Sequence, residues 1–225
     1  MSVIQLKPFA LLFVLAVIIP IAGSEIILLI AHLGMTNWAA AAVFHSVLAL
    51  FVFTTFALNP HLRFSKQNCL PLLEKHPSLA YLPALLVLVI SVLLVLFKAE
   101  TPYRFEHFSL KSFATVLLVP VVEEVCYRLG LSRLFSSIGG RIWGGYFSAL
   151  VFTTMHSLPS VERIINQEIG FFFGPFLLAL CCELIFGWSK QLFPAILLHM
   201  ACNSTGVIFS MAGGYWLNFF RFFYH

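Results

Sequence analysis

The chain has 225 residues, of which 60% are hydrophobic and only 10% charged, and its formal net charge at pH 7 is +4. A soluble domain of this length needs a far more polar surface, so the composition favours a single integral membrane domain over residues 1–225. The positive charges are scattered rather than clustered, which excludes a nucleic-acid partner.

Seven stretches of the sequence approach the roughly 20 mostly apolar residues that a transmembrane helix needs. Helices satisfy all their backbone polar groups internally, and the alternating pattern of a transmembrane barrel is absent. We therefore predict an all-α polytopic transmembrane bundle of about seven spans. The predicted spans are residues 8–31, 37–58, 79–98, 112–134, 141–158, 169–188 and 191–213.

The first apolar stretch resembles a signal peptide, because Lys7 precedes it and small residues follow at 22–24. Apolar sequence resumes after Glu25, so we interpret 8–31 as a retained first span. The chain then divides into three N-terminal spans with their loops, a motif-bearing part and an aromatic interfacial tail, which are residues 1–111, 112–213 and 214–225.

Charge in the loops predicts the orientation of the protein. Lys and Arg are slightly more frequent in the loops on the side of the N-terminus, which predicts a cytoplasmic N-terminus. We expect an integral protein of a prokaryotic inner membrane, and the lipid bilayer is therefore one of its expected partners. The five cysteines show no CxxC or zinc-type spacing, and we interpret them as small hydrophobic residues of a helical core.

Residues 121–130, VVEEVCYRLG, place three charges in an apolar span, where each ionisable side chain is costly. Glu124 and Arg128 are four apart with the acid first, the favourable order for a helical ion pair. Glu123 lies about 100° around the helix, on the face of Tyr127. It has no obvious charged partner and therefore suits a general base. Pro120 predicts a kink just before this segment.

Two later spans also carry polar side chains at helical spacing. Phe152 and His156 are four apart, as are His199 and Asn203. A carboxylate, with one histidine, can deprotonate a water, while the other histidine and the amide donate hydrogen bonds to an oxyanion. Glu123, His156 and His199 are also an alternative ligand set for Zn²⁺. The sequence has neither HExxH nor GxSxG.

Three motifs follow one another on these spans: EEVCYR fits EExxxR, FTTMH fits FxxxH, and HMACN fits HxxxN. In this order they resemble the CAAX protease and bacteriocin-processing family, also called Abi, which includes the Ras-converting prenyl-protein endopeptidases. The resemblance covers about residues 112–210. It implies a glutamate-dependent intramembrane protease without a cofactor. The implied catalytic residues are Glu123, His156, His199 and Asn203, with the motif residues Glu124, Arg128 and Phe152 in support. We add Tyr127 as a supporting residue, because it lies on the helix face of Glu123 and can hydrogen-bond to it.

The expected substrate is a protein or peptide with a membrane-associated C-terminal tail. A prenylated CAAX tail, a bacteriocin leader and a sorting signal all stay open. Two other classes of protein also place Glu and His in membrane helices, namely a proton-coupled transporter and a non-catalytic immunity or scaffold protein. Three further polar residues, Glu25, His45 and Glu183, we assign to helix packing.

Overall fold

The computed structural model describes residues 3–58, 75–98, 110–168, 170 and 172–211. Every regular element in this part of the chain is helical, which confirms the all-α prediction. The predicted interfacial tail and most of the loops 59–78 and 98–111 lie outside the described residues. The elements are α1 (Val3–Ala31), α2 (Asn37–Leu58), η3 (Pro77–Tyr81), α4 (Leu82–Lys98), α5 (Leu110–Glu124), η5 (Val125–Leu131), α6 (Ser132–Gly139), α7 (Arg141–Met155), α8 (Val161–Ile165), α9 (Phe173–Ser189) and α10 (Leu192–Met211).

The helices follow the hydropathy pattern closely. Six of the seven predicted spans each coincide with one long helix, namely α1, α2, α4, α7, α9 and α10. Within the described residues, two stretches, Pro8–Ala31 and Asn37–Thr55, are long and apolar enough by themselves to cross a membrane. The number of seven spans therefore stays a prediction.

The fourth predicted span differs from a simple α-helix. Its α-helical part ends at Glu124, a π-helix covers Val125–Leu131, and a further α-helix follows to Gly139. A π-helix has i→i+5 hydrogen bonds and a wider turn than an α-helix. The α-helical spacing that the sequence predicted for the whole EExxxR motif is therefore wrong beyond Glu124, and the angle between side chains four apart differs there from that in an α-helix.

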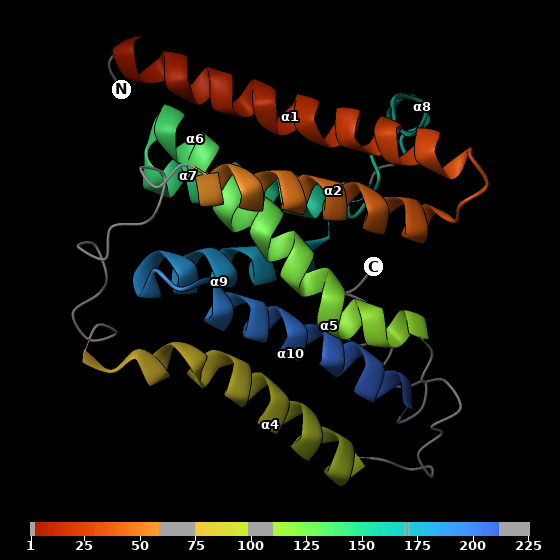
Figure 1. Ribbon diagram of the computed structural model, residues 1–225, viewed down its shortest axis with the longest axis vertical. Helices are drawn as coiled ribbons and strands as arrows, with labels where there is room; N and C mark the ends of the chain where they lie inside the picture. Colours follow the sequence, from red (N-terminus) through yellow and green to blue (C-terminus); the bar gives the residue numbers. More distant parts are fainter. Residues whose placement is uncertain (1–2, 59–74, 99–109, 169, 171, 212–225) are drawn as a thin grey trace. The chain divides into compact units, whose positions relative to one another are not determined.

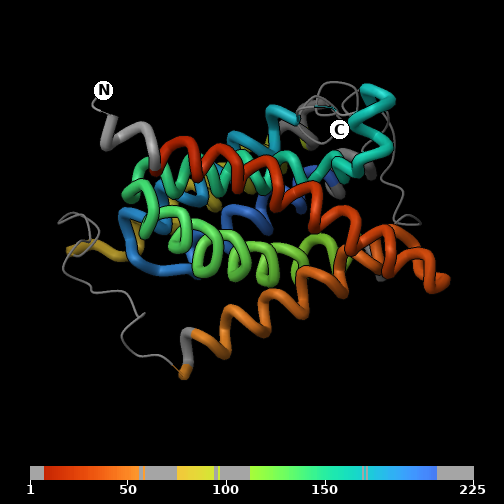
Figure 2. Tube along the Cα trace, turned by 90° about the horizontal axis from the view of Figure 1, so that it is seen from above, coloured from red at the N-terminus to blue at the C-terminus, as the bar shows by residue number. Residues whose placement is uncertain are grey.

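The described helices form two compact units, which we describe separately. The first contains α1, α2, η5, α6, α7, α8 and the beginning of α9. In this unit α1 and α2 form a helical hairpin, and α1 also lies along α6 and α7 (Figures 1 and 2). The helix α2 packs on the π-helix η5. The core of this unit includes the buried side chains of Leu12, Ile27, Phe135, Phe147 and Phe152.

A close approach between α6 and α7 depends on a glycine. A Cβ atom added at Gly144 would lie 2.5 Å from the backbone nitrogen of Ser136 and 2.7 Å from its Cα. These distances are too short for any side chain, and the atoms that it would meet are backbone atoms, which cannot turn away. Gly144 therefore allows these two helices to pack backbone to backbone.

The second unit contains η3, α4, α5, the end of α9, and α10. In it α10 lies between α4 and α5 and contacts both (Figure 1). Ser91 Oγ lies 2.8 Å from Thr205 Oγ1, and Tyr81 donates a hydrogen bond to Gln191 Oε1 at 3.4 Å. Tyr81 and Gln191 directly precede α4 and α10, whereas Ser91 and Thr205 lie within these helices. Because the contacts follow the same order along both helices, α4 and α10 run parallel. The buried Ser91–Thr205 contact joins them at mid-length.

Candidate active site

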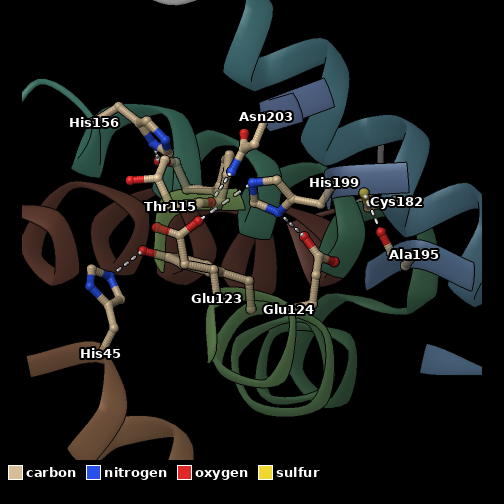
Figure 3. A network of polar contacts seen from close by, with 11 residues as sticks. His45, Thr115, Glu123, Glu124, His156, Cys182, Ala195, His199 and Asn203 are labelled. Atoms are coloured by element: carbon tan, nitrogen blue, oxygen red, sulfur yellow. Dashed lines mark hydrogen bonds and ion pairs between the residues drawn. The ribbon is translucent and has the colours of Figure 1, made fainter. Parts of the chain in front are cut away.

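The centre of the candidate site is His199, which lies between two carboxylates of α5 (Figure 3). Its Nδ1 is 2.9 Å from Glu124 Oε1, and its Nε2 is 3.6 Å from Glu123 Oε2. The first distance is that of a hydrogen bond, whereas the second is too long for one. No charged partner of Glu123 was obvious from the sequence, whereas in the structure the His199 ring lies beside it.

The two neighbouring carboxylates differ in their contact with solvent. The side chain of Glu124 is completely buried and that of His199 is 2% exposed, whereas that of Glu123 is 13% exposed. An ionised carboxylate only accepts hydrogen bonds, so Nδ1 of His199 is the donor in this contact when Glu124 is ionised. Of the two, Glu123 is the carboxylate that a water molecule can reach, while Glu124 holds the ring of His199 in place.

Asn203 shares a face of α10 with His199, as the spacing predicted. Its Nδ2 donates a hydrogen bond to the backbone carbonyl of Thr115 at 2.9 Å. His199 meets the end of α5 and Asn203 meets an earlier turn, so α5 and α10 run antiparallel. An amide nitrogen carries two protons, and the bond to Thr115 uses one of them.

The other motif residues, Tyr127, Arg128, Phe152 and His156, belong to the first unit. There the ring of Phe152 is the common contact, with its centroid 5.0 Å from that of Tyr127 and 4.5 Å from that of His156. The guanidinium carbon of Arg128 lies 5.7 Å from the same centroid, within the range of a cation–π contact. Arg128 is completely buried. The FxxxH and EExxxR motifs are thus in contact through Phe152.

His156 is the residue that directly follows α7, and it is exposed. Its Nδ1 lies 2.8 Å from the backbone carbonyl of Phe152. A carbonyl oxygen accepts only, so Nδ1 carries the proton, and Nε2 of the neutral ring presents a lone pair. As a neutral ring, His156 is therefore a proton acceptor at Nε2.

The segment after His156 is held by residues that sequence reasoning did not connect with the site. Oε1 of Glu25 on α1 accepts a hydrogen bond from the backbone nitrogen of Val161 at 2.8 Å. The guanidinium group of Arg163 donates to the carbonyl oxygens of Ser157 and Leu158. Our sequence analysis assigned Glu25 to helix packing, and nothing in its local sequence indicates a partner 136 residues away.

Metal binding was an alternative use of these side chains. Within the described part of the chain, no group of three or more His, Cys, Asp and Glu side chains is arranged to hold a metal ion. Nε2 of His199 and Oε2 of Glu123 are two donor atoms of the kind that Zn²⁺ prefers.

One comparison with known proteins gives a match. The model of a family described as type II CAAX prenyl endopeptidase Rce1-like matches residues 105–205. This stretch contains all three motifs, including the residues of α5 and α10 that meet at His199. The comparisons with curated proteins and with solved structures give no match.

Proposed function

Since residues 105–205 belong to the type II CAAX prenyl endopeptidase Rce1-like family, we propose that the chain cleaves a peptide bond near the C-terminus of a membrane-associated or lipidated substrate. The family is one of CAAX-type intramembrane proteases, and the apolar helices agree with a membrane protein. We further propose that Glu123 is the base, that the two histidines and Asn203 assist it, and that the cleaved bond lies near the C-terminus of the substrate.

The main support for this proposal is the contact of His199 with two carboxylates that differ in burial. Glu124 is buried and bonded to Nδ1, whereas Glu123 is partly exposed and faces Nε2 at 3.6 Å. A site that activates water needs one basic group that water can reach and other groups that hold its neighbours in a fixed orientation. Glu123 meets the first requirement, and the buried pair of Glu124 and His199 meets the second.

In the proposed reaction, Glu123 removes a proton from a water molecule whose oxygen attacks the carbonyl carbon of the scissile bond. The electrons of the carbonyl double bond move to its oxygen, which becomes an oxyanion. Glu123 then gives the proton to the leaving nitrogen, and the carbon–nitrogen bond breaks. The products are a carboxyl group and an amine, so the reaction consumes one water and no other reactant.

The oxyanion needs hydrogen-bond donors, and α10 supplies two candidates. Asn203 has a second N–H beyond the one that bonds Thr115. His199, when protonated, can donate from Nε2 while its Nδ1 stays bonded to Glu124. Such donors are usually among the largest contributions to catalysis. His156 enters the proposal only through its place in the FxxxH motif, as a second histidine of the proposed catalytic set.

The test is the cleavage of a farnesylated peptide that ends in Cys-aliphatic-aliphatic-X by purified protein in detergent. We expect Glu123→Gln to lower kcat by about 10²–10⁴-fold, because glutamine keeps the shape but cannot accept the proton. Circular dichroism and size-exclusion chromatography check that the variant is folded. Wild-type turnover by a folded Glu123→Gln protein would contradict the mechanism and favour the proton-relay or scaffold alternatives.

A further inference from the structure

A buried histidine on α2 contacts the motif segment, although it lies outside the residues that the family model matches. His45 has only 9% of its surface exposed. Its Nδ1 is 2.9 Å from the backbone carbonyl of Ala41, and its Nε2 is 3.2 Å from the hydroxyl of Tyr127 (Figure 3 draws this contact). Both residues belong to the first unit, where α2 packs on η5.

The two contacts define which atom donates in each hydrogen bond. The carbonyl of Ala41 accepts only, so Nδ1 of His45 carries a proton. In the neutral ring Nε2 then has a lone pair, and the Tyr127 hydroxyl donates to it. The thiol of Cys126 also lies 3.3 Å from the backbone carbonyl of His45. Two consecutive residues of the π-helix are therefore bound to one residue of α2.

Tyr127 in turn supports the FxxxH motif. Its ring meets the ring of Phe152 edge to face, at an interplanar angle of 86°, and the ring of Phe152 contacts that of His156. Ser148 holds the backbone of Tyr127 from α7, through a hydrogen bond of 3.1 Å to its carbonyl. Tyr127 is 5% exposed and Phe152 1%. In a close-packed interior, a displaced Tyr127 ring would displace that of Phe152, on which the ring of the exposed His156 packs.

We propose that His45 is a positioning residue for the FxxxH motif, which holds Tyr127 by its hydroxyl and, through Tyr127 and Phe152, sets the orientation of the His156 ring. This inference rests on the proposed function for its effect on cleavage. It extends the functional residues to α2, beyond the matched residues 105–205.

The kinetic test uses the full-length protein and the farnesylated peptide. His45→Leu removes the acceptor, Tyr127→Phe removes the donor, and His45→Gln places another acceptor oxygen near the position of Nε2. We expect kcat to fall about 3–10-fold in the first two variants, with KM unchanged, the effect of one net hydrogen bond. His45→Gln should retain most of the activity. The double variant should be no slower than either single variant, because the two share one bond.

A second measurement does not depend on cleavage. In protein with ¹³C-labelled histidine rings, the His156 signal is identified by its loss in His156→Gln. We expect this signal to shift in His45→Leu and in Tyr127→Phe. It should not shift in the matched control Ser91→Ala, which removes a buried hydroxyl contact in the other unit.

The two measurements separate failure of this inference from failure of the proposed function. An unchanged His156 signal in His45→Leu overturns the inference, as does a shifted signal with unchanged kcat. Equal loss of kcat in His45→Leu and His45→Gln overturns the role of the hydrogen bond. A wild-type protein that cleaves no farnesylated peptide overturns the proposed function, and the His156 signal still shows whether His45 orients that ring.

Discussion

Glu123 and Glu124 are adjacent in the sequence, yet their surroundings differ in the two properties that matter for acid–base chemistry. Glu124 is completely buried and accepts a 2.9 Å hydrogen bond, while Glu123 is 13% exposed and has its histidine contact at 3.6 Å. A general base must be reached by water, whereas an orienting group must not compete with water for its partner. This difference in burial is the reason that we propose different roles for the two carboxylates, although they are the same residue type.

The glutamine variants of Glu123 and Glu124 should differ in activity. Glu124→Gln should lower kcat by about 10–100-fold, less than Glu123→Gln, because the amide oxygen still accepts from Nδ1 of His199 and only the charge assistance is lost. Both variants are measured in the same peptide-cleavage assay, after thermal unfolding has shown the fraction folded. If Glu124→Gln were the slower of the two, the roles that we assign to the carboxylates would be reversed.

At the scale of helices, the packing of α6 on α7 brings two backbones together at one glycine. Gly144→Ala places a Cβ 2.5 Å from the backbone nitrogen of Ser136. Overpacking of this kind costs about 1–3 kcal/mol. We expect a clearly lower unfolding temperature for this variant, measured by fluorescence in detergent.

A matched control for Gly144 lies on α1. A Cβ at Gly23 would come within 3.1 Å of the terminal methyl group of Met155, which is the end of a flexible side chain and can move. Gly23→Ala should therefore destabilise the protein less than Gly144→Ala. Equal unfolding temperatures for the two variants would contradict a tight α6–α7 contact.

The π-helix η5 changes the directions of the side chains that follow Glu124 in the EExxxR motif. Pro120 cannot donate a backbone hydrogen bond within α5, and the wider turns begin just after Glu124. Tyr127 and Arg128 therefore take directions that α-helical spacing does not give. In the first unit both side chains contact Phe152. In this chain the xxxR part of the motif therefore lies in a π-helix and not in an α-helical turn.

At the scale of the whole molecule, metal dependence is the first property to test. We expect cleavage to survive dialysis against a chelator, because the proposed base is a carboxylate that acts directly on water. Metal content is measured by mass spectrometry on the same sample. Stoichiometric zinc, with activity lost on its removal and restored on its return, would instead support Glu123, His156 and His199 as ligands.

The second whole-molecule prediction concerns orientation in the membrane. The predicted seven spans and predicted cytoplasmic N-terminus would place the loop 59–78 in the cytoplasm and the C-terminus on the opposite side. Alkaline phosphatase fused after His225 should therefore be active, and the same enzyme inserted after Arg63 should be inactive. Green fluorescent protein at the same two positions is the control and should give the reverse result. Activity at both positions, or at neither, would contradict the predicted number of spans.

The sequence by itself determined the helices, because hydropathy and length act on each segment separately. It also predicted that His199 and Asn203 share a face of α10, since both lie in a regular α-helix, and both indeed contact α5. The three motifs were sufficient to indicate the family whose model matches residues 105–205.

Only the tertiary structure decided which side chains meet. Glu124 and His199 are 75 residues apart, His45 and Tyr127 are 82 apart, and Glu25 and Val161 are 136 apart. Local propensity does not encode such pairs, because they depend on which helix faces pack and on where η5 changes the helical repeat. The unequal burial of Glu123 and Glu124 has the same origin, since burial is a property of the packed helices and not of either residue.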